Sequence, residues 1–195
     1  TIRQSKLPAT KTLSNFDFSA NGTINAAQIK QFSQDALWLS QAENLILLGP
    51  SGTGKTHIAS AIGHGLIEKG ARVFFSSATM LIQSLQQAKS ELKLKNVFDR
   101  LSRFDLLILD DIGYVKKSEQ ETSVLFELIN HRYETGSLLI TANQAFSDWE
   151  NIFPDSIMAV AAIDRLIHHA TIIQTSGQSY RSQYAMNKNQ QKEAN

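Results

Sequence analysis

Short apolar runs alternate with stretches of helical periodicity along most of the chain. The runs are too short for core helices, so we expect each to be a buried strand; they cover residues 45–48, 73–75, 106–109, 138–141 and 171–173. Helical periodicity fills the intervals and predicts helices near residues 55–69, 81–88, 92–101, 118–136 and 156–169. Apolar strands separated by helices predict an α/β fold, a five-stranded parallel sheet sandwiched by helices.

Capping signals mark the starts of two helices. Asn25 with Gln28, and Ser118 with Glu121, each place a hydrogen-bonding side chain three residues before a Gln or Glu, as a capping box requires. The apolar positions after Asn25 continue at helical spacing as far as Leu37. This pattern predicts one uninterrupted helix before the first strand.

The composition of the chain limits what kind of protein it can be. Its 195 residues are enough for one domain with an appendage. The absence of Cys excludes a disulfide scaffold, a Cys-ligated zinc site and a Cys nucleophile. With 19 basic and 18 acidic side chains the chain is not a strongly basic nucleic-acid binder, although a local basic patch is compatible with this balance.

Both ends of the chain are polar. Residues 1–23 are interpreted as a linker or wrapping arm left from a missing N-terminal domain, residues 24–186 as the folded domain, and residues 187–195 as a disordered tail. No apolar run approaches the ~20 residues of a membrane helix, and the first residues contain no secretory signal. We therefore expect a cytoplasmic protein with no membrane partner and, because the chain begins with Thr1 rather than Met, a fragment of a longer protein.

One motif carries specific chemistry. The pattern G-x-x-x-x-G-K-[ST] lies between the first predicted strand and the helix at 55–69, and its residues are Gly49, Pro50, Ser51, Gly52, Thr53, Gly54, Lys55 and Thr56. Such a loop directs backbone N–H groups and a helix N-terminus at phosphate oxygens. The predicted ligand is ATP, with Lys55 at the β- and γ-phosphates and the Thr56 hydroxyl on Mg²⁺. His57 follows directly and is counted with the nucleotide contacts, while its side chain, like that of His64, is interpreted as structural.

Two acidic residues end the third predicted strand. Asp110 and Asp111 follow residues 106–109, so they lie at the sheet edge where α/β proteins bind ligands. Asp110 is predicted to hold Mg²⁺, and Asp111 to act as general base on the attacking water, which favours hydrolysis of ATP over transfer to an acceptor. The alternative is a pair of surface Asp residues before a turn at Gly113. The strand at 73–75 between the two motifs is typical of P-loop proteins in which another strand separates them in space.

Two further polar residues are candidates for catalysis. Asn143 follows the fourth predicted strand and is expected to orient water beside the γ-phosphate; the alternative is an Asn that starts a turn. Arg165 lies roughly 160° from the centre of the apolar stripe of its helix. We therefore expect Arg165 to point away from its own core, as an arginine finger that reaches a neighbour's nucleotide would, and an ordinary solvated Arg is the alternative.

The other polar clusters are less specific. His168 and His169 are adjacent and point about 100° apart on a helix, so they are interpreted as polar edge or interface residues rather than metal ligands. Five cations between the second and third strands could follow a DNA backbone or could form a solvated helix face; they are Lys89, Lys93, Lys95, Arg100 and Arg103.

Taken together, these residues resemble the IstB-like ATPases of the AAA+ superfamily, helper proteins of insertion-sequence transposition that are related to the DnaC-type helicase loaders. The resemblance covers roughly residues 3–184 and rests on an ordered set of strings: GPSGTGKTHIASAIG, LLILDDIGY, LFELINHRYETGSLLITANQAFSDWENIF, AAIDRLIHHATII and GQSYR. The lead-in KLPATKTLSNFDF also fits the segment that precedes the ATPase core in that family.

The resemblance implies properties that spacing alone does not. The fold would be an AAA+ P-loop NTPase with an initiator-type extra helix after the second strand, near residues 89–103, where such proteins hold DNA. Arg165 would be the arginine finger and Arg181 the second sensor. The active protein would be an ATP-dependent oligomer on double-stranded DNA that recruits or stimulates a cognate transposase.

The chain departs from the family pattern at two places. The N-terminal helical domain that family members normally carry would precede residue 1, and its loss would weaken assembly. Asp111 stands where AAA+ proteins more often have Glu, and its shorter side chain would slow hydrolysis.

Three alternative functions share parts of this pattern. A DnaC-like replicative helicase loader has the same chemistry with a different partner. A P-loop small-molecule kinase would need an Arg-rich lid that the sequence does not contain. A non-catalytic DNA-binding module is disfavoured by the intact set of Lys55, Thr56, Asp110 and Asn143.

Overall fold

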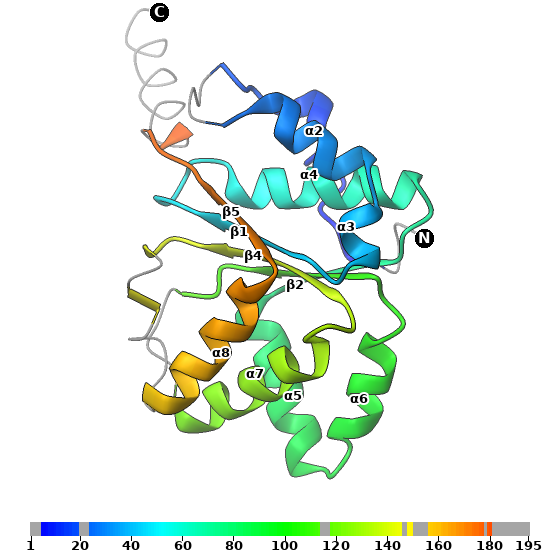
Figure 1. Ribbon diagram of the computed structural model, residues 1–195, viewed down its shortest axis with the longest axis vertical. Helices are drawn as coiled ribbons and strands as arrows, with labels where there is room; N and C mark the ends of the chain where they lie inside the picture. The colour runs from blue at the N-terminus through cyan, green and yellow to red at the C-terminus, as the bar shows by residue number, and fades with distance from the viewer. Residues whose placement is uncertain are drawn as a thin grey trace, which may run out of the picture.

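A five-stranded parallel sheet forms the centre of the computed structural model, which describes residues 5–19, 24–113, 118–145, 148–149, 156–177 and 179–180 (Figure 1). The strand order is β2-β3-β4-β1-β5. The strands are β1 (Asn44–Leu48), β2 (Val73–Ser77), β3 (Leu106–Asp110), β4 (Ser137–Ala142) and β5 (Ala170–Gln174). All five predicted strands are confirmed, and β4 lies between β1 and β3, as the spacing of the two motifs predicted.

Helices cover both faces of the sheet, because alternate strand side chains enter two separate cores. In β1, Ile46 and Leu48 belong to one core, and Leu45 and Leu47 to the other. The first core is covered by α5 (Ala78–Ser90), α6 (Leu94–Leu101), α7 (Glu119–Arg132) and α8 (Ser156–His168). The second is covered by α2 (Ala26–Gln34), α3 (Leu37–Ser40) and α4 (Lys55–Glu68) (Figure 1). Within the described ranges, no helix combines the length and apolarity that crossing a membrane requires.

The single helix predicted before β1 is wrong, because the structure has two. After α2, Asp35 takes an extended conformation with φ −106° and ψ 116°. The Asp35 carboxylate accepts a hydrogen bond from the Leu37 N–H (2.9 Å), which starts α3 in a new direction. Leu37 is consequently 66% exposed, and Trp38 is buried instead, with its ring N–H donating to the Phe32 carbonyl (3.2 Å).

Two helices connect β2 to β3, and α6 is the extra one. Leu92 adopts a left-handed conformation (φ 57°) and is 94% exposed, so α6 begins at Leu94 rather than at residue 92. Leu101 of α6 is buried, and Phe98 stacks on the His131 ring of α7 with 4.8 Å between the centroids. The inner face of α6 is therefore held against α7, and its outer face carries the charged residues.

The N-terminal segment, residues 5–19, packs along α4 and includes a single 3₁₀ turn, η1 (Leu13–Asn15). His64 donates a hydrogen bond from Nε2 to the Pro8 carbonyl (3.0 Å), and His57 donates from Nε2 to the Thr12 carbonyl (2.8 Å). The two histidines are two turns apart on α4, so together they fix the path of the segment along the helix. This path brings residues 11–17 beside the loop between β1 and α4.

Candidate active site

The loop between β1 and α4 has the backbone that a phosphate-binding loop needs. Gly49 and Gly52 both have positive φ, 143° and 84°. A Cβ at Gly49 would overlap Thr175, and a Cβ at Gly52 would overlap the side chain of Ser179. Glycine is therefore required at both positions, since the strand β5 and the residues after it pack directly against the loop.

Lys55 and Thr56 open α4 at the carboxyl end of β1. Lys55 is 8% exposed, and its Nζ donates to the carbonyls of Gly49 (2.6 Å) and Pro50 (2.7 Å). These bonds hold the ammonium inside the arch of the loop, where phosphate oxygens would meet it. Thr53 reinforces the arch by donating to the Pro50 carbonyl (2.8 Å).

Asp110 joins the two sequence motifs. The Thr56 hydroxyl donates to Asp110 Oδ2 (3.0 Å), and the Thr141 hydroxyl donates to Asp110 Oδ1 (2.7 Å). The Asp111 N–H in turn donates to the Thr141 hydroxyl (2.9 Å). A Thr hydroxyl beside a carboxylate is a set of hard oxygen donors that fits Mg²⁺. Sequence analysis did not assign Thr141 a role, since its contact depends on β4 lying beside β3.

Asp111 and Asn143 both line the pocket over the loop. Asp111 has a left-handed backbone (φ 63°), which turns the chain away from β3 and leaves its side chain exposed. Asn143 Oδ1 is buried and has no hydrogen-bond partner within the described part of the chain. A buried acceptor of this kind fits a water molecule that attacks the nucleotide, since an unmet buried acceptor is unfavourable. The predicted roles of both residues stay predictions.

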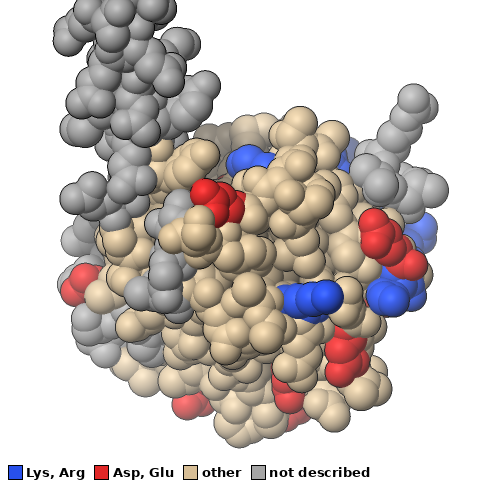
Figure 2. Space-filling view, turned by 90° about the horizontal axis from the view of Figure 1, so that it is seen from above, with Lys and Arg blue, Asp and Glu red and all other residues tan. Residues whose placement is uncertain are grey.

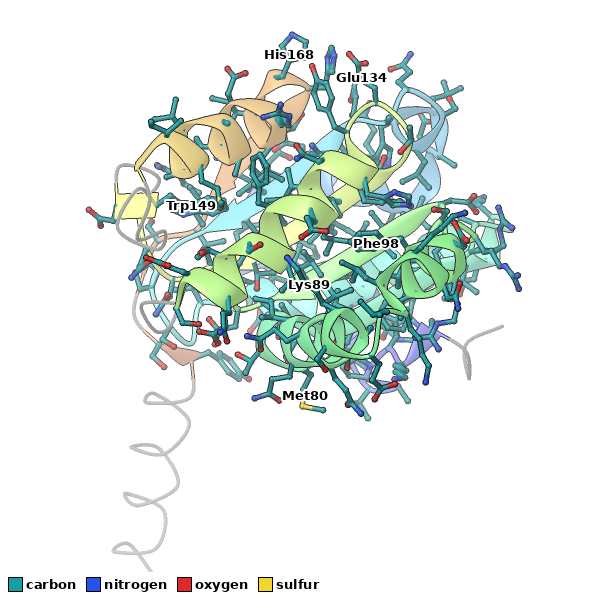
Figure 3. All side chains as sticks on the ribbon, turned by 90° about the horizontal axis from the view of Figure 1, so that it is seen from below. Met80, Lys89, Phe98, Glu134, Trp149 and His168 are labelled. Carbon is teal, nitrogen blue, oxygen red and sulfur yellow. The ribbon has the colours of Figure 1, made fainter. Side chains whose placement is uncertain are left out.

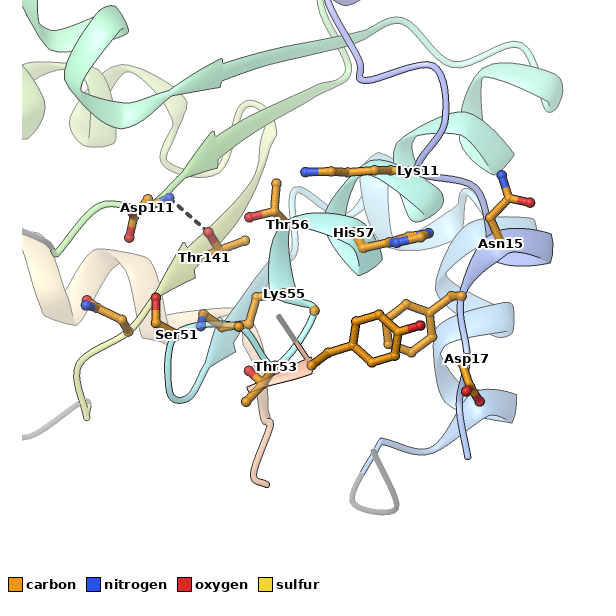
Figure 4. Close-up of a pocket in the computed structure, with 15 residues that line it drawn as sticks. Lys11, Asn15, Asp17, Ser51, Thr53, Lys55, Thr56, His57, Asp111 and Thr141 are labelled. Atoms are coloured by element: carbon orange, nitrogen blue, oxygen red, sulfur yellow. Dashed lines mark hydrogen bonds between the residues drawn. The ribbon is translucent and has the colours of Figure 1, made fainter. Parts of the chain in front are cut away.

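An aromatic wall that the sequence analysis missed completes the pocket. Figure 4 shows Asp111 and Thr141 on one side, Asn15 and Asp17 on the other, and His57 between them. Besides Asn143, the remaining lining residues outside the P-loop are Lys11, Phe16 and Tyr180. Phe16 packs edge-on against His57, with 5.1 Å between the ring centroids, and its ring lies next to Gly54. The pair of Phe residues in the string NFDF was the available signal.

Arg165 does not lie where the periodicity placed it. The buried face of α8 consists of Ala159, Ala162 and Leu166, whereas Val160 is 57% exposed. Arg165 therefore flanks the core instead of lying opposite it, and the expected orientation away from its own core is wrong. Its Nη1 donates to the Ala161 carbonyl (2.8 Å), and its guanidinium lies 5.5 Å from the centre of the Phe126 ring of α7.

The arginine-finger role of Arg165 remains a prediction. Arg165 is half-buried at a surface groove whose other lining residues are Tyr133, Ile157, Val160, Ala161 and Asp164. The groove is separate from the pocket over the P-loop. Arg181, the predicted second sensor, lies outside the described residues.

The five cations considered for DNA contact differ in their surroundings. Lys89 is paired with Glu127 of α7 (2.6 Å; Figure 3), and Lys93 with Glu91 (2.8 Å). The other three are exposed and make no ion pair with any described residue; they are Lys95, Arg100 and Arg103. Figure 2 shows the opposite face of the molecule, on the side of α2 and α4, where basic and acidic residues are interspersed among uncharged ones. Lys95, Arg100 and Arg103 are therefore the cations of this group that no described carboxylate pairs with.

Solved structures define the class of fold. The DnaC helicase loader matches with a TM-score of 0.69 at 20% identity, over 86% of this chain and 98% of that chain. AMPPCP-bound DnaA from Aquifex aeolicus also matches with a TM-score of 0.69, at 22% identity, over 95% of this chain and 56% of that chain. With its five-stranded parallel sheet, the chain has the AAA+ type of P-loop α/β fold.

Sequence comparison gives the family. The profile of the IstB-like ATP binding protein family matches residues 1–188. A protein of Sinorhizobium fredii named as an insertion sequence ATP-binding protein is 49% identical over 185 residues, and one of Pseudomonas aeruginosa named for insertion sequence IS21 is 41% identical over 180 residues. The matches cover 95% and 92% of this chain, and this chain spans 62% and 68% of the length of those two relatives. The chain belongs to the family of IstB-like ATP binding proteins, as its motifs predicted.

Proposed function

We propose that this chain binds ATP with Mg²⁺, hydrolyses the ATP, and acts as a DNA-binding helper of transposition. The observation that carries the proposal is the network in which the Thr56 hydroxyl and the Thr141 hydroxyl hold the two oxygens of Asp110 beside Lys55. This network joins the phosphate-binding loop to the acidic end of β3 by direct hydrogen bonds.

Each residue of the site has a distinct part in the proposed reaction. The loop N–H groups and the start of α4 bind the phosphates, and the Lys55 ammonium leaves the Gly49 and Pro50 carbonyls for phosphate oxygens. Thr56 and Asp110 would hold Mg²⁺, which supplies charge neutralisation when it is bound.

Two other residues activate and orient the attacking water. Asp111 takes the proton of that water as general base, since its exposed carboxylate lines the pocket at this edge of the sheet. Asn143 Oδ1 accepts a hydrogen bond from the same water and orients it.

The surface of α8 supports the proposed assembly of several copies. Ile157 and Val160 are 81% and 57% exposed and border the groove that contains Arg165. An apolar helix face beside a half-buried guanidinium suits a second copy of this chain, whose nucleotide Arg165 would reach. Since the net charge is only +1, DNA affinity then depends on several protomers that present Lys95, Arg100 and Arg103 together.

The partner is proposed from the names of the relatives. Both relatives described above are named for insertion sequences, so a cognate transposase is the proposed partner. The alternative is a replicative helicase, suggested by the likeness in fold to the DnaC helicase loader, which matches over 98% of that chain at 20% identity. Retention of purified transposase or helicase on the immobilised ATP-bound chain separates the two.

The test of the proposed function is ATP turnover with and without duplex DNA over a range of protein concentrations. Turnover per chain is expected to rise with concentration and with DNA, because the site is completed between subunits. Lys55→Ala gives the background rate, and Lys69→Ala, an exposed Lys just after the same helix, is the matched control with unchanged turnover. Turnover that is absent, or independent of both DNA and concentration, contradicts the proposal.

Phe16→Ala is expected to weaken adenine-nucleotide binding by roughly 5–30-fold, as loss of one base–aromatic contact of about 1–2 kcal/mol does. The ring of Phe16 forms the wall of the pocket next to Gly54 and His57, where a base would lie. Displacement of a fluorescent ATP analogue measures the change. Phe18→Ala is the control, because Phe18 touches Phe16 (4.7 Å between centroids) but does not line the pocket. Equal affinities of both variants and the parent chain would place the base elsewhere.

A further inference from the structure

Three potential metal ligands meet at the end of the sheet opposite the P-loop. Glu134 lies in the connection between α7 and β4, His168 is the last residue of α8, and His169 lies between α8 and β5. One ligand atom from each of the three side chains lies within 4.8 Å of the other two, and all three residues are exposed. Figure 3 shows Glu134 and His168 side by side at this end of the molecule.

The backbone on both sides of the cluster is fixed. Glu134 has a left-handed conformation (φ 58°) directly after α7, and the Gly136 N–H donates to the Arg132 carbonyl (3.0 Å) to close that turn. The His169 carbonyl accepts a hydrogen bond from the Asn44 N–H of β1 (2.6 Å). The three side chains are therefore brought together by well-defined ends of two helices and not by a free loop.

The chemistry of the cluster suits a zinc-like ion. Two imidazole nitrogens and a carboxylate oxygen are the ligands of open zinc sites, with bonds of about 2.0–2.1 Å that place ligand atoms roughly 3.3 Å apart. Exposed side chains can close from 4.8 Å to this spacing by rotation alone. Two adjacent histidines could not form such a site by themselves. The fold supplies the third ligand, Glu134, from a segment far earlier in the chain than His168.

Tyr133 supports the cluster from behind. Its hydroxyl lies 3.0 Å from His168 Nδ1 and can accept a hydrogen bond from that nitrogen, which leaves the Nε2 lone pair for a metal. An oriented histidine of this kind is typical of metal sites.

We propose that Glu134, His168 and His169 bind a divalent transition-metal ion of the zinc class, and that the bound ion clamps the end of α7 to the end of α8. The clamp acts on the helix that carries Arg165, three residues before His168, and Tyr133 lines the same groove as Arg165. The site thus stiffens the part of the surface proposed to meet a second copy. The metal-binding inference itself does not depend on ATP hydrolysis.

The test is a titration of the metal-free chain with Zn²⁺ alone, in the presence of millimolar Mg²⁺ and a competing chromophoric chelator. The expected result is one bound Zn²⁺ per chain with micromolar or tighter affinity, and a higher Tm with Zn²⁺ than without it. His168→Ala, His169→Ala and Glu134→Gln each lose both effects. Tyr133→Phe is expected to bind Zn²⁺ about tenfold more weakly, because it keeps the three ligands and loses only the orienting hydroxyl.

His131→Ala is the matched control. His131 lies near the same end of α7 as Glu134, but it stacks on Phe98 and is not in the cluster. Its affinity for Zn²⁺ is expected to equal that of the parent chain. The proposal is overturned if the parent chain binds Zn²⁺ no more tightly than millimolar. It is also overturned if His168→Ala and Glu134→Gln bind as the parent chain does, or if His131→Ala loses binding equally. The folded state of each variant is checked by circular dichroism, and the exposure of these side chains makes unfolding an unexpected outcome.

Discussion

Mixing the Asp111→Asn and Arg165→Ala variants in equal amounts is expected to restore ATP turnover that neither variant has alone. Each protomer would supply the loop and general base for its own nucleotide and Arg165 for its neighbour's. In the mixture, about a quarter of the head-to-tail interfaces combine an intact Asp111 with an intact Arg165. Turnover of the mixture is measured against each variant alone at the same total concentration with duplex DNA.

The two single substitutions remove different parts of the reaction. Asp111→Asn removes the proton acceptor and is expected to lower turnover by about 10²–10⁴-fold. Asn tolerates the left-handed backbone at this position and keeps the N–H that donates to Thr141, so nucleotide affinity stays within about twofold. Arg165→Ala removes the charge that stabilises the transferred phosphoryl group and is expected to lower turnover by about 10³–10⁵-fold.

Arg165 can serve a neighbour because of its place on the surface. It lies in its own groove, apart from the pocket that contains Asp111, so it is not a group of its own site. A mixture that turns over no faster than the sum of its two components contradicts transfer between subunits. Arg165→Lys is a useful companion variant, because it keeps the charge but loses the planar guanidinium and is expected to remain impaired.

The phosphate-binding half of the site could be predicted from the sequence because its signals are local. The P-loop is one continuous run, and the acidic pair directly follows an apolar strand. A strand buried on both faces is apolar throughout, so its pattern is recognised without knowing its neighbours. The structure adds the contact between Thr56 and Asp110 that joins the two motifs.

The roles of Thr141 and Phe16 could not be predicted from local sequence signals, because they depend on elements far apart in the chain. Thr141 reaches Asp110 only because β4 lies beside β3 in the sheet. Phe16 belongs to a polar segment, and it reaches the pocket because His57 and His64 hold that segment along α4. Strand order and the path of a segment over a helix are tertiary properties that periodicity does not contain.

The misplaced orientation of Arg165 and the break after α2 have one physical cause. Helical periodicity treats every apolar residue as facing the core, yet Val160 and Leu37 are 57% and 66% exposed. On α8 the exposed apolar residues shifted the apparent stripe toward the surface. Before β1, the Asp35 carboxylate ended one helix and started another where the apolar spacing alone showed no break.

Arg132→Met is expected to lower the free energy of unfolding by about 3–5 kcal/mol, the usual cost of breaking a buried hydrogen-bonded charge network. Arg132 is 3% exposed, and its guanidinium donates to the carbonyls of Phe104 (3.0 Å), Asp105 (3.1 Å) and Ser137 (3.0 Å). Met fills similar volume but removes the guanidinium donor from all three carbonyls at the start of β3 and β4, of which the Asp105 carbonyl keeps a backbone donor, the Ser137 N–H (3.4 Å). Burial lowers the pKa of Arg132 to about 10, against the opposing charge of Asp105, so the side chain is still charged at neutral pH. Urea unfolding followed by circular dichroism measures the change.

Arg72→Met is the matched control, because Arg72 also pairs with Asp105 (2.9 Å) but its side chain is 62% exposed. A solvent-exposed pair of this kind contributes no more than about 1 kcal/mol, so a much smaller loss is expected. Arg132→Lys should be nearly as harmful as Arg132→Met, since one ammonium cannot reproduce a planar fork that reaches three carbonyls. A loss below about 1 kcal/mol for Arg132→Met would mean that water replaces the guanidinium at these carbonyls, and that the strand ends do not depend on it.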